Sequence, residues 1–238
     1  MTTTKTVALV TGANKGIGFE IARQLGRRGL TVVVGARDEA KGRAAAEALR
    51  GEGLDVHHVK LDVGSEADVA ALPGWFAQRF GRLDVLVNNA GIALWARDDV
   101  AAFRETLDAN VQGVVAVTYA LLPLLRESPA GRIVNHSSVL GSLTSIGQAP
   151  DQFGDFINPA YTTSKAALNG FTVALAHKFR GTRLKVNSAH PGWVKTDLGG
   201  DNAPLTTEVG AQTAVALATL PDDGPTGKFI HLGQPLPW

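Results

Sequence analysis

The sequence predicts an α/β protein with a doubly wound parallel sheet of about seven strands, in three layers and a single domain spanning residues 1–238. Short runs rich in Val and Ile alternate along the chain with longer segments of helical periodicity, the order typical of a parallel sheet. These runs are nearly continuously apolar, as expected for strands that are covered on both faces. No internal repeat, low-complexity tract or Pro/Gly-rich linker divides the chain.

The expected elements follow in strand-helix order. From their β-branched composition, strands are expected at residues 6–11, 31–36, 55–61, 83–91, 131–138, 183–192 and 227–232. From their periodicity, helices are expected at residues 16–29, 39–51, 66–80, 100–126, 160–180 and 206–219. The stretches 141–160 and 192–206 are expected to be irregular loops that follow strand ends, where open parallel sheets bind ligands. The prolines of the C-terminal HLGQPLPW are expected to prevent a regular strand there.

Composition excludes several classes of function. The formal net charge is +1, with 23 basic and 22 acidic residues, so bulk electrostatics favour neither nucleic acid nor an anionic membrane as partner. The chain has no cysteine, which excludes disulfides and thiolate chemistry and suits the cytoplasm. His57 and His58 would point to opposite faces of a strand, so no metal site is expected. The N-terminal apolar run is too short for a signal peptide, and no later segment is expected to reach a membrane span of ~18 apolar residues.

The segment TGANKGIG joins the first expected strand to the first expected helix. Its glycines, Gly12, Gly16 and Gly18, would let the backbone approach a pyrophosphate, which the N–H groups at a helix N-terminus attract. Three glycines could simply form a tight turn, but their place between strand and helix favours the functional interpretation. The segment therefore predicts a Rossmann-type dinucleotide site.

The end of the second strand indicates which dinucleotide binds. NAD-binding folds usually carry an acid there for the ribose 2′-hydroxyl, whereas NADP-binding folds carry a cation for the 2′-phosphate. Ala36 stands where the acid is expected and Arg37 follows it, while Lys15 of the glycine loop could reach the same phosphate. Each could be an ordinary surface cation, but together they favour NADP(H). Asp38 is expected to point away from Arg37.

Tyr161 and Lys165 stand four residues apart in YTTSK and would share one face of a helix. The lysine could merely cover the aromatic ring with its aliphatic stem. Alternatively, its charge could tune the acidity of the phenol.

Taken together, the motifs of the chain resemble the short-chain dehydrogenase/reductase family over essentially the full length. The motifs that carry this resemblance are TGANKGIG (11–18), LDV (61–63), NNAG (88–91), Asn110, SSVLG (137–141), YTTSK (161–165) and HPGWVKTD (190–197). The combination of NKGIG, ARD and PGWVKTDLGG is most similar to the carbonyl reductase branch. The resemblance implies reduction of ketones or aldehydes with NADPH.

The resemblance also implies which residues bind the cofactor. For the pyrophosphate turn and the adenosine phosphate end it implies Gly12, Asn14, Lys15, Gly16, Ile17, Gly18 and Arg37. For the adenine and adenosine-ribose side it implies Asp62, Val63, Asn89, Ala90 and Gly91, although Asn89 could equally tie neighbouring strands together. For the nicotinamide half it implies Pro191, Gly192, Val194 and Thr196, with Tyr161 and Lys165 beside the ribose.

The resemblance assigns the catalytic roles as well. Tyr161 would donate a proton to the carbonyl oxygen, and Lys165 would lower the pKa of its phenol and hold the cofactor ribose. Ser138, rather than its neighbour Ser137, would donate a hydrogen bond to the same oxygen. Asn110 is a poor helix former that either satisfies a backbone gap or takes part in a water relay behind Lys165.

The distance between Ser138 and Tyr161 departs from the family pattern. It is longer than is typical of the family, so about ten residues are inserted before the tyrosine. In carbonyl reductases such an insertion covers the helix face that other members use to form tetramers, so a monomer is favoured over a dimer or tetramer. Candidates for the wall of an apolar substrate pocket are Trp95, Phe153, Phe156 and Trp193.

One function from another class competes with the enzyme. A catalytically silent NADP-sensing regulatory protein would keep the fold but is expected to lose Tyr161 or Lys165, and this chain keeps both. The sequence therefore favours an NADPH-dependent carbonyl reductase.

Overall fold

The computed structural model of the protein describes residues 5–238, apart from the side chains at positions 150 and 155. The start of the N-terminal segment, in which no signal peptide is expected, lies outside these residues. The strands, in chain order, are β1 Val7–Thr11, β2 Thr31–Ala36, β3 Val56–Lys60, β4 Val85–Asn88, β5 Arg132–His136, β6 Lys185–Ala189, β7 Phe229–His231 and β8 Gln234–Pro235. They form one sheet in the order β3-β2-β1-β4-β5-β6-β7-β8, in which every neighbouring pair except β7 and β8 is parallel.

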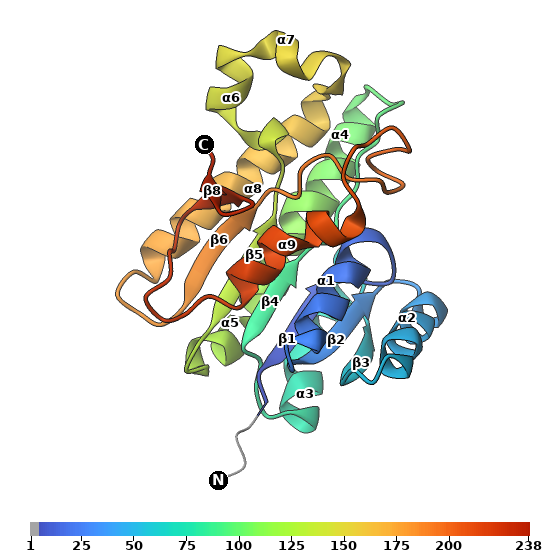
Figure 1. Ribbon diagram of the computed structural model, residues 1–238, viewed down its shortest axis with the longest axis vertical. Helices are drawn as coiled ribbons and strands as arrows, with labels where there is room; N and C mark the ends of the chain where they lie inside the picture. Colours follow the sequence, from blue (N-terminus) through green and yellow to red (C-terminus); the bar gives the residue numbers. More distant parts are fainter. Residues whose placement is uncertain (1–4) are drawn as a thin grey trace.

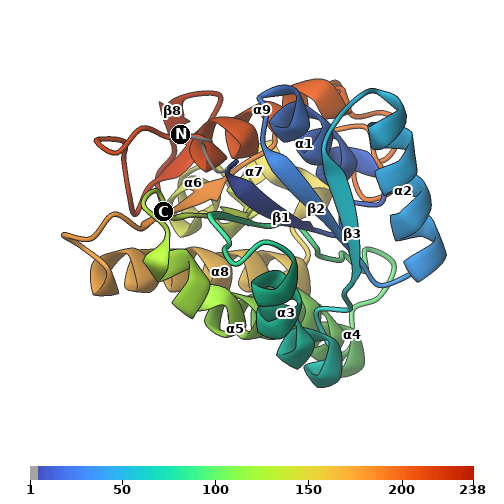
Figure 2. The same ribbon diagram turned by 90° about the horizontal axis from the view of Figure 1, so that it is seen from below.

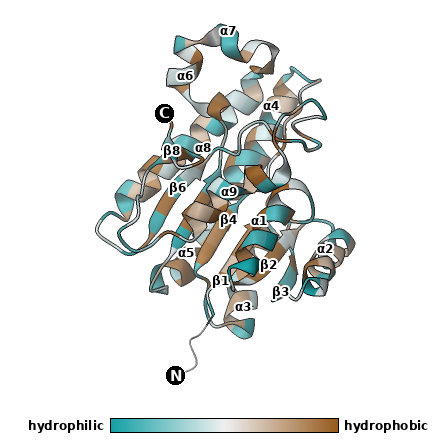
Figure 3. Ribbon diagram, viewed as in Figure 1, coloured by the Kyte–Doolittle hydropathy of each residue, from teal (hydrophilic) through white to brown (hydrophobic). Residues whose placement is uncertain are grey.

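Helices cover both faces of the sheet, which gives the expected three layers (Figures 1 and 2). One face packs against α1 Gly16–Arg27, α2 Glu39–Gly51 and α9 Thr207–Ala218. The other packs against α3 Glu66–Arg79, α5 Gly113–Glu127 and α8 Pro159–Lys178. The central strands β1, β2, β4 and β5 are buried along their whole length, which explains the apolar runs of the first three. Figure 3 shows these hydrophobic strands inside a more hydrophilic layer of helices.

Short polar side chains fix where several helices begin. Asp38, Ser65, Asp99 and Asn158 each accept a hydrogen bond from the backbone N–H three residues later. Asn158 binds the N–H of Tyr161 at 3.0 Å, so this cap also fixes the start of the helix that carries YTTSK.

The structure differs from the expected elements at three places. The expected helix 100–126 is divided into α4 Val100–Leu107, a π-helical turn at Asp108–Gln112, and α5. The expected loop 141–160 contains the short helices α6 Leu143–Gln148 and α7 Pro150–Phe153, flanked by 3₁₀ turns at Val139–Gly141 and Gly154–Phe156. The expectation of no strand at the C-terminus was wrong for β8, a two-residue edge strand, where a proline costs no ladder hydrogen bond.

The helical segment Val100–Glu127 is long and apolar enough to span a membrane by length and composition alone, which the sequence prediction did not anticipate. It packs along one side against α3 and α8, and its middle carries the buried polar side chains of Asn110 and Thr118. These contacts are those of a core helix.

The inserted segment before Tyr161 lies at one end of the molecule, beside the N-terminal end of α8 (Figure 1). It does not cover the outer face of α5 and α8, because Tyr119 and Val173 on these helices are 49% and 41% exposed. The monomer was predicted because the insertion was expected to cover this helix face. The structure does not support that reason.

Candidate active site

Ser138, Tyr161 and Lys165 meet at the carboxyl edge of the sheet. Ser138 stands two residues after the end of β5, while Tyr161 and Lys165 project from the first turns of α8, which packs on the 3₁₀ turn after Ser138. The Lys165 ammonium lies 5.5 Å from the centroid of the Tyr161 ring, and the Ser138 side chain is near enough to the phenol to lower its pKa. The three residues are only 6–8% exposed, so the site is closed to solvent.

Burial dominates the ionisation of Tyr161 and Lys165 in the free protein. Burial raises the pKa of the phenol to about 12, and the hydrogen bond from Ser138 lowers it by less. Burial also lowers the pKa of Lys165 to about 8, because the interior disfavours its charge. Burial is thus the largest influence on the phenol in the free protein, and the expectation that Lys165 lowers its pKa when the cofactor is present stays a prediction.

A backbone carbonyl fixes the position of Lys165. Its ammonium donates a hydrogen bond of 2.8 Å to the carbonyl oxygen of His136, the last residue of β5. Gly91 lies close by, since a Cβ at that position would be 3.6 Å from Lys165 Nζ and 3.0 Å from Asn110 Oδ1. The absence of a side chain at Gly91 thus leaves open the space beside the lysine.

Asn110 lies in the π-helical turn and is fully buried. Its side chain accepts from the N–H and donates to the carbonyl of Ile92, both at 2.8 Å, and donates to Ser164 Oγ at 3.0 Å. Asn110 therefore satisfies a backbone gap, one of the two roles expected for it, and contacts the residue that precedes Lys165. The π-helical turn explains how a poor helix former is accommodated.

Ser137 is placed away from the phenol. Its N–H donates to the Ala189 carbonyl at 2.8 Å, and its hydroxyl faces the Lys165 carbonyl at 3.5 Å. This placement agrees with the expectation that Ser138, and not Ser137, faces the substrate oxygen.

The glycine-rich turn lies at the same edge. Gly12 and Gly16 have φ of 64° and 57°, and a Cβ at Gly12 would meet the Cα of Ala90 at 2.9 Å. A Cβ at Gly18 would meet Asn89 Nδ2 at 2.4 Å, so the third glycine allows α1 to pack on the end of β4. The turn is tied to β4 by Asn89, whose amide donates to the carbonyls of Thr11 and Gly12 at 2.9 and 3.3 Å. Asn89 thus has the strand-tying role that the sequence left open.

The residues of this turn fit the diphosphate of a dinucleotide. α1 begins at Gly16 without a side-chain cap, so the first N–H groups of Gly16, Ile17 and Gly18 face the turn with no partner within the helix. Uncapped N–H groups and the positive end of the helix dipole suit an anion. Asn14 lies half-buried in the same turn.

The end of β2 fits a 2′-phosphate better than a ribose hydroxyl. Arg37 is exposed and forms no ion pair with any residue that the structure describes. Asp38 is engaged as the cap of α2, where it accepts from Lys41 N at 3.0 Å. At the end of β3, Asp62 accepts from Gly64 N, and Val63 packs against Gly113 of α5.

Lys15 does not point toward Arg37. Its ammonium forms an ion pair with Asp197, and both side chains are largely exposed. Thr196 lies close to the same turn, since its methyl group would be 3.5 Å from a Cβ at Gly16. The segment after β6 therefore lies across the glycine turn, and Lys15 links the two.

The other residues expected near nicotinamide follow β6. Gly192 has φ of 85°, and a Cβ there would meet Leu205 at 2.4 Å, so the turn after Pro191 requires glycine. Val194 is buried against Gly210 of α9 and forms a bridge with Leu205. Its side chain therefore anchors the loop.

Aromatic side chains lie near Tyr161 and the loop after β6. Trp95 lies 5.0 Å from the Tyr161 ring, and Phe156 lies 5.1 Å from Trp193. The indole N–H groups of Trp95 and Trp193 donate to the carbonyls of Leu198 and Gly199 at 3.0 and 2.7 Å. Three of the four expected pocket residues thus gather around the loop after β6, whereas Phe153 is half-buried in α7.

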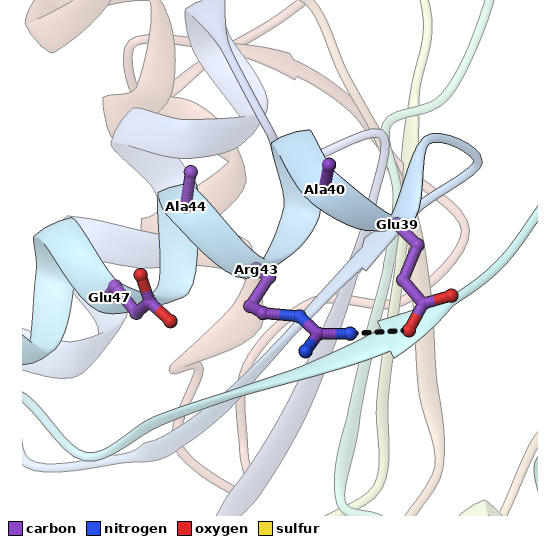
Figure 4. A pocket seen from close by; sticks show the side chains of 5 residues that line it. All are labelled: Glu39, Ala40, Arg43, Ala44 and Glu47. Atoms are coloured by element: carbon purple, nitrogen blue, oxygen red, sulfur yellow. Dashed lines mark hydrogen bonds and ion pairs between the residues drawn. The ribbon is translucent and has the colours of Figure 1, made fainter.

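A shallow hollow lies away from these residues. It is a shallow groove on α2, lined by Glu39, Ala40, Arg43, Ala44 and Glu47, with Arg43 hydrogen-bonded to Glu39 at 2.6 Å (Figure 4). It holds none of the residues expected to be catalytic.

Sequence reasoning missed two histidines of the site. His136 and His190 end adjacent strands, and burial is the main cause that lowers the pKa of each to about 3. His136 Nδ1 lies 2.8 Å from Asn89 Oδ1, and His190 Nδ1 accepts from Val139 N at 3.3 Å. The sequence signal that could have identified them is their position: His136 comes directly before the SS motif and His190 directly before the PG motif.

Comparisons with known proteins agree with this geometry. The family model described as short chain dehydrogenase matches residues 6–204. Carbonyl reductase [NADPH] 1 of Mus musculus is 36% identical over 280 aligned positions that cover all of both chains, and the Bos taurus protein is 37% identical over 279. Both alignments exceed 238 positions, so these relatives carry residues that this chain lacks.

Solved structures of reductases also superpose on this chain over nearly its whole length. An NADPH-bound carbonyl reductase from chicken fatty liver superposes with a TM-score of 0.84 at 27% identity, covering 99% of this chain and all of the other. Salutaridine reductase from Papaver somniferum superposes with a TM-score of 0.81 at 33% identity, covering 94% of this chain and 99% of the other. The expected resemblance is confirmed: this chain belongs to the short-chain dehydrogenase family.

Proposed function

We propose that this protein reduces the carbonyl group of a small, apolar ketone or aldehyde to an alcohol with NADPH as the hydride donor. The observation that carries the proposal is the meeting of Ser138, Tyr161 and Lys165 beside the glycine turn, at one edge of the sheet. The expectation of an NADP(H)-dependent oxidoreductase that acts on C=O or CH–OH groups is confirmed by the family match and the curated relatives.

In this proposal Tyr161 donates a proton to the carbonyl oxygen as negative charge develops on it. The hydroxyl of Ser138 donates a hydrogen bond to the same oxygen. Lys165, held by the His136 carbonyl, provides the positive charge nearest to the phenol. Asn110 positions Ser164 and the Ile92 backbone next to Lys165, and we assign it a place in a proton relay behind the lysine.

NADPH, when bound, supplies the hydride. The uncapped start of α1, from Gly16 to Gly18, would hold its diphosphate, and Arg37 would hold its 2′-phosphate. The remaining residues assigned to the cofactor are Gly12, Asn14, Lys15, Asp62, Val63, Asn89, Ala90, Gly91, Pro191, Gly192, Val194 and Thr196. Of these, Val194 would act through its backbone, because its side chain is buried against α9.

The substrate would enter past Trp95, Phe156 and Trp193. These side chains form an apolar rim near Tyr161, which favours substrates with hydrophobic groups next to the carbonyl. We also propose that the enzyme is cytoplasmic, since it has no cysteine, and that it has no nucleic-acid or membrane partner, since its charge is balanced. We further propose that it is a monomer, which its mass in solution tests.

The test is oxidation of NADPH by the wild-type protein with a panel of ketones, aldehydes and quinones, repeated with NADH. The proposal expects turnover with carbonyl compounds and a marked preference for NADPH. Tight binding of NADPH without turnover on any member of the panel would instead favour the NADP-sensing regulatory protein.

A further inference from the structure

His136 is held in one tautomer by its neighbours. The Asn89 amide nitrogen donates to the carbonyls of Thr11 and Gly12, so the Asn89 oxygen can only accept. The Nδ1 atom of His136, 2.8 Å from that oxygen, must therefore carry the proton. The other ring nitrogen, Nε2, is then an acceptor with a free lone pair.

This acceptor has no partner. His136 Nε2 is buried and forms no hydrogen bond with any residue that the structure describes. The imidazole also stays neutral, because burial and the nearby Lys165 and His190 lower its pKa to about 3. A buried acceptor without a donor costs free energy, so it is expected to have a role when a ligand is present.

The place of His136 in the sheet indicates which ligand could supply the donor. Its neighbour Asn135 bonds Thr172 of α8, so the His136 side chain lies on the opposite face of β5, the face that packs against α1 and α9. Nδ1 is turned toward Asn89 at the end of β4. His136 pairs with Ala189 of β6, two residues before Pro191.

His136 also contacts both halves of the proposed cofactor site. Its ring supports Asn89 and the glycine turn, and its carbonyl holds Lys165. Its Nε2 is covered along with Ser138, Tyr161 and Lys165, which are similarly buried. Because His136 is the last residue of β5, its ring lies at the same carboxyl edge of the sheet as these three residues.

We infer that His136 Nε2 binds the nicotinamide-riboside half of NADPH by accepting a hydrogen bond from one of its hydroxyl or amide groups. This inference rests on the proposed function. It adds a cofactor-binding residue that is specific to the nicotinamide half, since the contact needs no part of the adenosine half.

The test compares two ligands by calorimetric titration of the full-length protein. NADPH contains the nicotinamide riboside, whereas adenosine 2′,5′-bisphosphate lacks it. In His136→Asn the shorter amide can still donate to Asn89 from the position of Nδ1, but nothing replaces Nε2. We expect His136→Asn to weaken NADPH binding about tenfold and to leave binding of the bisphosphate unchanged.

The matched variant His136→Gln places an amide oxygen near the position of Nε2 and is expected to recover most of the NADPH affinity. Equal weakening of both ligands in His136→Asn would overturn the inference, since it would show only a structural effect through Asn89. Unchanged NADPH binding in His136→Asn would overturn it too. A wild-type protein that binds the bisphosphate but not NADPH would overturn the proposed function together with the inference, whereas the other two results would leave the proposed function intact.

Discussion

Burial controls the protonation of the histidines next to the catalytic residues. His136 and His190 have pKa values of about 3, below the ordinary value of 6.5, because the interior disfavours their charged form. In the unfolded chain both bind protons as the pH falls below 6.5, whereas in the folded protein they do so only near pH 3. Their depressed pKa values therefore lower stability as the pH falls from 6.5 toward 3.

This linkage predicts acid sensitivity. Each histidine is expected to remove on the order of 1 kcal/mol of unfolding free energy per pH unit below 6.5. Urea denaturation at several pH values between 6.5 and about 5 measures this slope, and His136→Gln should reduce it by about half. An identical slope in the variant would show that His136 is not the buried neutral group described here.

At the same scale, Arg37 is expected to determine the choice of cofactor. Arg37→Asp removes the free cation at the end of β2 and adds a repulsive charge, so the preference for NADPH over NADH should fall by about 10- to 100-fold. The measurement is kcat/KM with each cofactor. Arg43→Asp on the outer face of α2 is the matched control, and an equal loss in the control would mean that only general electrostatics are involved.

At the scale of elements, the loop after β6 is linked to the glycine turn. Lys15 and Asp197 form an exposed ion pair, and Trp95 and Trp193 bind the carbonyls of Leu198 and Gly199. In the free protein Asp197 therefore competes with a phosphate for Lys15.

Asp197→Asn is expected to tighten NADPH binding about threefold, because Lys15 is released and a negative charge near the phosphates is removed. Protein stability should change little, since exposed ion pairs contribute little. Fluorescence titration with NADPH at low and moderate salt measures the effect, with Lys15→Met expected to change affinity in the opposite direction. Weaker binding in Asp197→Asn would indicate that the pair helps to close the loop over the cofactor.

The sequence predicted the regular elements well and the loops less well. Strands such as Val7–Thr11 and Thr31–Ala36 match their expected ranges because burial on both faces leaves a continuous apolar signal. The π-helical turn around Asn110 and the short helices before Tyr161 have no such signal, since they depend on tertiary hydrogen bonds to Ile92 and Ser164 and on packing against the turn after Ser138.

The sequence indicates which residues meet at the candidate site, but not how burial shifts their pKa values. The motif order located Ser138, Tyr161, Lys165 and the glycine turn, whereas the raised pKa of Tyr161 depends on how completely the folded chain excludes water. The ion pair of Lys15 with Asp197 joins residues 182 positions apart, which no local pattern indicates. His136 was missed because a histidine at a strand end resembles an ordinary core residue until its unpaired nitrogen is known.

At the scale of the whole molecule, the oligomeric state can be checked directly. A monomer would give a mass of 24.9 kDa by light scattering. A multiple of this mass would contradict the monomer prediction and indicate self-association, for which the exposed apolar residues Tyr119 and Val173 offer a surface. Val173→Lys should then restore the monomer.

In the proposed mechanism Tyr161 supplies the proton for carbonyl reduction, while most of the NADPH contacts come from other residues. The most direct measurement is kcat of Tyr161→Phe, together with its dissociation constant for NADPH. Because general acid catalysis typically contributes about 10²- to 10⁴-fold, we expect kcat to fall by about that factor while NADPH binding changes little. A variant that retains wild-type kcat would contradict the account.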